Sequence, residues 1–197
     1  MVSYPYIQDL FTAILKQSKT IQGRFHMSYR YGAQEINSDE LGELVSVISE
    51  KKYPLALMPP PTSRGEINST KEGDWERYRI IIFFVKNSFY GEGNKVNYNT
   101  NTSTHTILHD WHDMKRAAYA FKRKLEFIQR NSKGLSKHRV PNNQCLCFPV
   151  STNGNDRVSG VKFDFDLDLY IGCPPNEDYD HFDIPEIKDD SHPEHKL

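Results

Sequence analysis

The amino-acid sequence predicts an α+β fold, in which a small antiparallel or mixed β-sheet carries one long amphipathic helix across a face and short helices lie near the N-terminus. The first observation is segment 106–130, where apolar side chains recur every three or four residues along one side of a helix: Ile107, Trp111, Met114, Ala118, Phe121, Leu125 and Ile128. The second is segment 158–171, in which polar residues alternate with apolar ones: Val161, Phe163, Phe165, Leu167, Leu169 and Ile171. A two-residue period indicates a strand with one buried face, so we expect the helix to cover that face.

Three further elements are predicted near the N-terminus. Residues 7–15 have helical spacing, and Pro5 suits the first turn of a helix. Residues 21–31 alternate between apolar and polar side chains, which predicts a strand. Residues 37–40 resemble a capping box, so we expect a second short helix over 37–48.

The next segments predict a strand, a loop and a central strand. Residues 53–58 are apolar and are followed by three prolines at 59–61, so this strand ends there or lies at a sheet edge. Residues 62–74 are polar and are expected to form an exposed loop. Residues 75–85 become apolar on both sides from Ile80 onward, which predicts a strand in the middle of the sheet.

A long polar segment precedes the predicted long helix. Residues 87–105 are rich in Asn, Thr, Ser and Gly around three aromatic residues, Phe89, Tyr90 and Tyr98. A loop of this length is unusual in a compact domain unless it has a function or is disordered.

The C-terminal third predicts a loop, a hairpin and a tail. Residues 131–143 form a basic loop, and residues 145–150 form a short strand that a turn at 153–156 joins to the final strand. We therefore expect one α+β domain over residues 1–172 and an acidic, proline-rich tail over residues 173–197.

Composition narrows the classes of function. The chain has 197 residues, of which 37% are hydrophobic and 26% charged, and its formal net charge of −1 argues against a dedicated nucleic-acid binder. Three cysteines do not make a disulfide framework in a chain of this size, and we see neither a signal peptide nor an apolar stretch long enough to cross a membrane.

One group of residues has the chemistry of a metal site. His105, His109, Asp110, His112 and Asp113 carry imidazole and carboxylate groups, which bind transition metals. Their spacing does not match a known helical zinc motif. The alternative is a polar N-terminal turn, where the helix dipole favours acidic residues.

A second group is a row of carboxylates on the final strand. Asp164, Asp166 and Asp168 lie on one face, roughly 6.5 to 7 Å apart. Such a row occurs in metal-dependent nucleases, but it also keeps a strand soluble or contacts basic residues of a partner subunit.

The third group is basic and follows the long helix. Arg116, Arg123 and Arg130, with Lys122, lie in a region from 115 to 139 whose only acidic residue is Glu126. These side chains could bind nucleic-acid phosphates or form a solvated face. Because the final strand and the tail are acidic, opposite charges also suit a head-to-tail contact between identical copies.

The order of these elements resembles a known family. The short helix, the strand, the YPLALMPPP segment, the WERYRIIIFFV strand, the long helix and the final alternating strand are similar to the neck and tail-terminator proteins, the head-to-tail connectors, of tailed bacteriophages. Those of Bacteroidetes phages, including the crAss-like group, look nearest. The resemblance covers roughly residues 3–172 and contains no diagnostic motif.

This resemblance implies a structural virion protein without an active site, a cofactor or a bound metal. It would be made in the bacterial host cytoplasm and would assemble as a hexameric or dodecameric ring at the head-to-tail junction. Its partners would be further copies of itself and the adjacent portal, neck or tail proteins. On this interpretation the 87–105 loop and the acidic tail contact neighbouring rings, and the basic helix face meets packaged DNA or another copy.

Two alternative functions remain open at this stage. A metal-dependent nuclease or phosphodiesterase would use Asp164 and Asp166 together with His109 and His112, with Asp113 as a further candidate metal ligand. A nucleic-acid-binding module would use the basic helix face.

Overall fold

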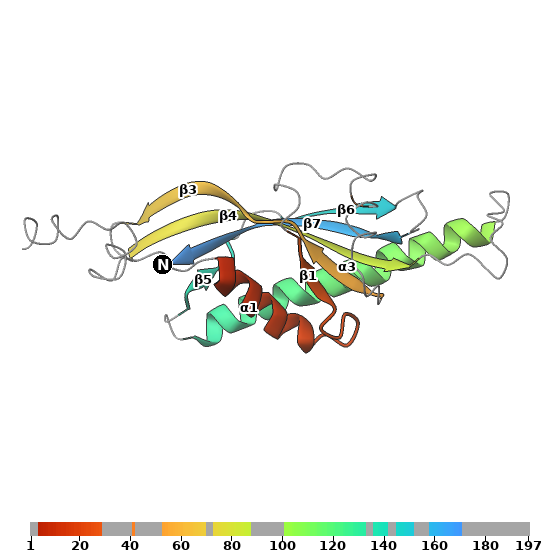
Figure 1. Ribbon diagram of the computed structural model, residues 1–197, viewed down its shortest axis with the longest axis horizontal. Coiled ribbons are helices and arrows are strands. Elements are labelled where there is room, and N and C mark those ends of the chain that lie inside the picture. Colours follow the sequence, from red (N-terminus) through yellow and green to blue (C-terminus); the bar gives the residue numbers. More distant parts are fainter. Residues whose placement is uncertain are drawn as a thin grey trace, which may run out of the picture.

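The computed structural model of the chain describes residues 4–28, 41, 53–69, 73–87, 101–132, 136–141, 145–151 and 158–170. Two helices lie on the same side of a long, twisted sheet (Figure 1). The described elements are α1 (Tyr4–Lys16), β1 (Phe25–Met27), β2 (Leu55–Met58), β3 (Thr62–Ser69), β4 (Gly73–Asn87), α3 (Asn101–Asn131), β5 (His138–Arg139), β6 (Leu146–Ser151) and β7 (Val158–Tyr170).

The seven described strands form one mixed sheet, so the predicted α+β class is correct. Their order is β1-β2-β4-β7-β5, with β3 also paired to β4 and β6 also paired to β7. The β1–β2 pair is parallel, and every other described pair is antiparallel. The two longest strands therefore lie side by side at the centre, and shorter strands extend the sheet from each of them.

β4 and β7 pair along their whole common length, from Trp75 opposite Tyr170 to Asn87 opposite Val158. The prediction that residues 75–85 form a central strand is confirmed. Gly160 allows a close approach within this pair, because a Cβ atom at that position would collide with the backbone carbonyl oxygen of Phe84.

Two helices, rather than one, cover the first face of the sheet, which we call the helix face. Phe121 of α3 packs against Phe11 of α1, with ring centroids 4.9 Å apart, and against Phe84 and Phe165 of the sheet at 6.0 and 6.3 Å. The prediction of a single long helix across this face is therefore incomplete. The apolar face of α1 also needed burial, and the sheet is wide enough to accept both helices.

The opposite face of the sheet, here called the second face, is divided into two parts. Near the start of β7, apolar side chains form a buried cluster: Leu55, Leu57, Ile81, Phe83, Val85 and Val158. Leu41, which is helical, packs in this cluster. The rest of the helix predicted over 37–48 lies outside the described residues. Toward the end of β7 and the start of β4, which lie side by side, the second face is charged.

The prediction of an exposed loop over 62–74 is wrong for most of this segment. Residues 62–69 form β3, which pairs with β4 from Thr62 opposite Arg79 to Ser69 opposite Gly73. Gly65, with a φ of 100°, lies where the register shifts between Ser63 and Glu66, so it provides the backbone conformation of a β-bulge. The prolines at 59–61 end β2 as predicted. Backbone pairing with β4 then resumes in β3, although residues 62–69 are mostly polar.

Other boundaries also differ from the predictions. α3 begins at Asn101 rather than at residue 106, and the strand predicted over 21–31 is described only as the three residues of β1. β5 lies within the segment 131–143 that we expected to be a loop. Strands β6 and β7 agree with the prediction. Phe89, Tyr90 and Tyr98 lie outside the described residues.

Among the helices that the structure describes, none has the length and apolar character needed to span a bilayer.

Candidate functional site

The aspartate row of β7 forms ion pairs within its own chain, on the second face of the sheet. Arg77 binds Asp168 with two hydrogen bonds of 2.7 and 3.0 Å. Arg79 binds Asp164 diagonally, at 2.6 Å, and Arg64 of β3 approaches Asp166 at 3.2 Å. We call these six residues the arginine–aspartate ladder.

The ladder corrects the interpretation of its aspartates as a solvated row. Asp164 and Asp168 are only 6% and 8% exposed. Their carboxylates accept charge-assisted bonds from guanidinium groups, which compensates for the loss of hydration. The hydrogen bond from Arg77 to Asp168 also raises the pKa of the Arg77 guanidinium, which stays charged. The expectation that these aspartates contact a neighbouring copy stays a prediction, and much of their charge is already neutralised.

Sequence reasoning missed the arginine partners. Arg77 and Arg79 are two residues apart in β4, as Asp164, Asp166 and Asp168 are in β7, so each set lies on one face of its strand. Matching two-residue charge patterns in predicted neighbouring strands would have been the signal. The pairing depends on the register, which the sequence does not show.

An aromatic group lies near the start of β4, beyond the ladder. The guanidinium carbon of Arg139 lies 3.9 Å from the centre of the Trp75 ring, a cation–π contact. The Trp75 and Tyr170 rings meet edge to face at 5.4 Å. These contacts hold β5 and the end of β7 against β4.

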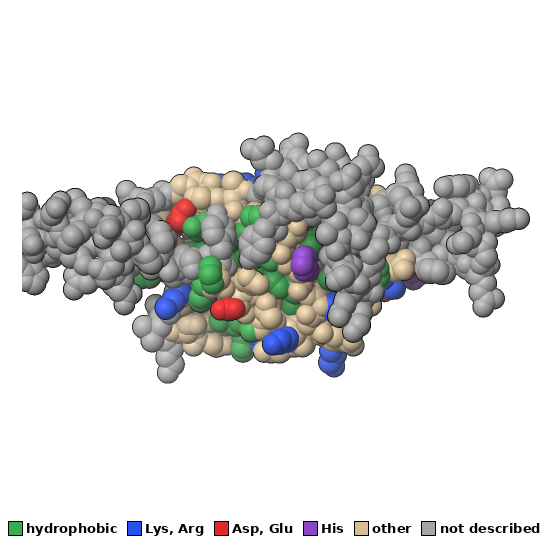
Figure 2. Space-filling model, in the orientation of Figure 1, with side chains coloured by type: hydrophobic (Ala, Val, Ile, Leu, Met, Phe, Trp, Pro, Cys, Tyr) green, Lys and Arg blue, Asp and Glu red, His purple; other side chains and the backbone are tan. Residues whose placement is uncertain are grey.

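A different charged surface lies between the turn after α1 and the middle of α3. It is an open pocket of about 1120 Å³ whose lining includes six basic residues: Lys19, Lys86, Lys115, Arg116, Arg123 and Lys124. Among the described residues that line it, Asp113 is the only acidic one. We call it the basic pocket. Figure 2 shows Lys and Arg side chains along the lower half of the described surface, over the helices.

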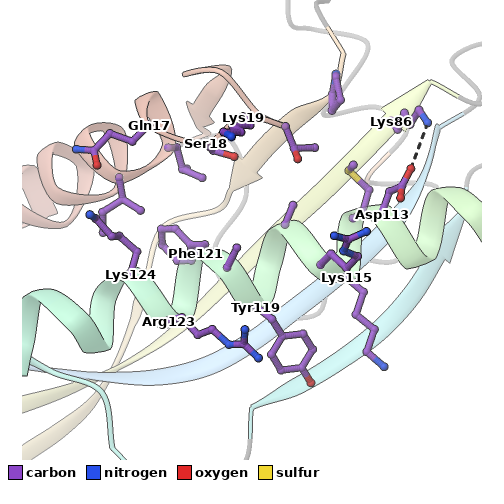
Figure 3. Close-up of a pocket in the computed structure, with 18 of the residues that line it drawn as sticks. Gln17, Ser18, Lys19, Lys86, Asp113, Lys115, Tyr119, Phe121, Arg123 and Lys124 are labelled. Atoms are coloured by element: carbon purple, nitrogen blue, oxygen red, sulfur yellow. Dashed lines mark ion pairs between the residues drawn. The ribbon is translucent and has the colours of Figure 1, made fainter.

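The pocket also has apolar side chains between its charges, namely Ile14, Leu15, Met114, Ala117 and Phe121. In the close-up view, Lys19 after α1 and Lys124 on α3 lie on either side of Phe121 (Figure 3). A partner segment that carries both acidic and apolar side chains would find matching chemistry there.

Most of the basic groups in the pocket form no ion pair with a described residue. Lys86 is the exception, because its ammonium lies 3.1 Å from Asp110 and 3.8 Å from Asp113. Lys124 lies over the Phe127 ring at 5.2 Å. Within the described ranges no ion pair is formed by the remaining basic residues of the pocket: Lys19, Lys115, Arg116 and Arg123.

The four predicted basic interface residues therefore separate into two groups. Arg116 and Arg123 line the basic pocket. Lys122 and Arg130 lie outside its lining and pair with Glu126 at 3.1 and 3.7 Å. Only the first group offers uncompensated charge in the described part of the chain.

The described side chains of the candidate metal site have other contacts, and the side chain of His105 lies outside the described ones. Asp110 is 2% exposed, accepts a hydrogen bond from the Ser159 hydroxyl at 2.7 Å and pairs with Lys86. It therefore fastens α3 to the sheet and is not in the first turn, because the helix begins at Asn101. His109, His112 and Asp113 are exposed, and His112 lies 4.0 Å from Asp113.

The described residues contain no cluster of three or more His, Cys, Asp or Glu side chains arranged to bind a metal. The residues of the nuclease alternative lie on opposite sides of the sheet. His109 and His112 belong to α3 on the helix face, whereas Asp164 and Asp166 point to the second face and contact arginines. The structure does not bring these four residues together.

One buried histidine was not identified from the sequence. His138 is buried at the end of α3, where its Nδ1 lies 3.1 Å from the Tyr6 hydroxyl and its Nε2 lies 3.3 Å from the Leu125 carbonyl oxygen. Burial lowers the pKa of His138, although the contact with Leu125 acts in the opposite direction. The neutral ring therefore connects α1, α3 and β5.

Comparisons of the chain with protein-family models, with curated proteins and with solved structures find no match.

Proposed function

We propose that this protein is a non-catalytic structural component of a tailed bacteriophage, which forms a ring at the head-to-tail junction as a neck, tail-terminator or tail-completion protein. Its partners are further copies of itself and the adjacent portal, neck or tail proteins. The order of elements along the sequence supports this family. The α+β fold agrees with what the resemblance implies.

The observation that carries the proposal is the difference between the two charged surfaces. The ladder is compensated within the chain, whereas Arg116 and Arg123 line a pocket without an acidic partner among the described residues. Uncompensated charge beside apolar side chains suits a protein-binding surface, since charge complementarity selects a partner and apolar contact adds affinity.

The nuclease alternative receives no comparable support. Its two aspartates and its two histidines belong to opposite sides of the sheet, and catalysis would require them to converge on one metal and one phosphate. A ring with this basic pocket could also contact packaged DNA. Such contacts would go to the backbone phosphates and would not depend on the DNA sequence.

The proposal is tested by the native mass of the protein. Light scattering and sedimentation over a concentration series should give a discrete ring-sized species, and negative-stain electron microscopy should show rings of uniform diameter. If assembly needs a template, the monomer should form rings once a purified portal or tail protein is added. A monomer under both conditions would overturn the proposal.

A variant tests whether the pocket takes part in assembly. Arg116→Glu with Arg123→Glu should reduce assembly while the folded monomer is retained. The control changes two exposed basic residues outside the pocket, Arg130→Glu with Lys137→Glu, and it alters the net charge equally. Metal-dependent hydrolysis of DNA that is lost in Asp164→Asn or His109→Gln would instead support the nuclease.

A further inference from the structure

We propose that the basic pocket binds the acidic segment at residues 177–186 of a neighbouring copy of the same chain. This inference rests on the proposed ring, and it names the partner of one surface of that ring.

The first argument is chemical complementarity. The segment 177–186 has the sequence EDYDHFDIPE, in which acidic residues are interspersed with Tyr179, Phe182 and Ile184. The pocket has the opposite arrangement, with six basic residues around apolar ones such as Met114 and Phe121. The segment and the pocket therefore carry opposite charge, and both have apolar side chains between their charged ones.

The second argument is spacing. Arg116 and Arg123 are seven residues apart on α3, which places them about 10 Å apart along the helix axis. In a polyproline II conformation, which has three residues per turn, Asp180 and Asp183 lie on the same face and about 9 Å apart. A segment in that conformation along α3 can pair both arginines at the same time.

The third argument is that the other acidic surface is already in use. Asp164 and Asp168 are buried and paired with Arg79 and Arg77. Further carboxylates are available in the tail. The sequence has eight acidic residues between 177 and 194: Glu177, Asp178, Asp180, Asp183, Glu186, Asp189, Asp190 and Glu194.

The choice of a neighbouring copy as the donor of the segment rests on the proposed ring. β7 ends at Tyr170, opposite Trp75, and the basic pocket includes Lys86 near the other end of β4. Eleven residues separate Trp75 from Lys86, which corresponds to about 36 Å along the strand. Tyr170 therefore lies at the end of the sheet that is remote from Lys86, and a head-to-tail contact between copies lets the segment of one copy reach the pocket of the next. Such a heterologous contact closes into a ring when the rotation between copies allows it.

The deciding experiment mixes two full-length variants. The pocket variant carries Arg116→Glu and Arg123→Glu, and the tail variant carries Asp180→Asn, Asp183→Asn and Glu186→Gln. Each variant alone should remain monomeric in sedimentation velocity. An equimolar mixture should form a dimer that grows no further, because one variant supplies the tail and the other supplies the pocket.

A labelled synthetic peptide of residues 174–190 tests the contact when the wild-type chain does not assemble by itself. It should bind the tail variant, bind the pocket variant about tenfold more weakly or worse, and lose affinity when NaCl rises from about 50 to about 500 mM. The control protein carries Arg130→Glu and Lys137→Glu together with the tail changes. It should bind the peptide as tightly as the tail variant does.

Other outcomes overturn the inference. Wild-type rings that neither variant disrupts would retain the proposed function but exclude this contact. Peptide binding to the tail variant without any association in the mixture would assign the segment to its own chain. Pocket-dependent binding of duplex DNA with no peptide binding would assign the pocket to phosphates. A monomer that binds neither the peptide nor a portal or tail protein would end both proposals.

Discussion

Two charged regions of the molecule differ in how their charges are compensated. In the arginine–aspartate ladder, Asp164 and Asp168 are buried and bind Arg79 and Arg77 of the neighbouring strand. In the basic pocket, Lys86 pairs with Asp110 and Asp113, but Lys19, Lys115, Arg116 and Arg123 form no ion pair with a described residue. The first region stabilises the folded chain, and the second has charge left for a partner. A cluster of charge indicates a binding surface only when its internal partners are known.

The largest expected effect comes from a residue between two ladder aspartates that points away from them. Phe165 is 4% exposed on the helix face, against Phe121. Phe165→Asp should lower the free energy of unfolding by about 4 kcal/mol or more, because an unpaired carboxylate would be buried. Urea unfolding followed by circular dichroism measures this. Asp166→Asn, at the next residue on the second face, should change stability by less than about 1 kcal/mol.

A smaller effect is expected within the ladder itself. Asp168→Ala should destabilise the fold by about 2 to 3 kcal/mol, since Arg77 would lose its bidentate partner in a partly buried site. The double variant Arg77→Met with Asp168→Leu should recover much of this loss, because it leaves no unpaired charge. Equal destabilisation by the single and double variants would show that the pair contributes through packing rather than charge.

The third prediction concerns a polar group that is buried without charge. Because burial lowers the pKa of His138 below 6.5, the unfolded chain takes up the proton first as the pH falls. His138 therefore contributes full stability above about pH 6.5, and this contribution declines below it by at most about 1.4 kcal/mol per pH unit. Denaturation at about pH 7.5 and about pH 5.5 should show a smaller pH dependence in His138→Gln than in wild type. The same pH dependence in both proteins would contradict this role.

The smallest effect is expected in the basic pocket. Arg116→Gln and Arg123→Gln should each change the free energy of unfolding of the monomer by no more than about 0.5 kcal/mol, because neither side chain has a described ionic partner. Thermal unfolding under conditions that keep the protein monomeric measures this. A loss comparable to that of Asp168→Ala would mean that the pocket, like the ladder, belongs to the fold.

Much of the central sheet could be predicted from local patterns. The alternation in residues 158–171 identified β7 and its buried face, and the apolar run from Ile80 identified a central strand. The polar strand β3 could not be found in this way. Its hydrogen bonds depend on the exposed edge of β4, which is a property of the assembled sheet and not of residues 62–69.

The sequence identified only some of the residues in each of the two charged regions. The aspartates of β7 and the basic residues of α3 were both identified, but the arginine partners of the first and the contributions of Lys19 and Lys86 to the second were not. These residues come from elements far apart in the chain. Their proximity is a consequence of strand register and of the packing of α1 beside α3.

The sequence by itself determined which residues face the core, because hydrophobic periodicity follows directly from the geometry of a helix or a strand. It also determined the separation of basic and acidic segments along the chain. Only the tertiary structure decided which charges are compensated, because an ion pair needs two groups within about 4 Å, and that distance is set by packing between remote segments. In this protein, the aspartates of β7 are paired within the chain, whereas the basic pocket between α1 and α3 keeps charges that no described residue pairs.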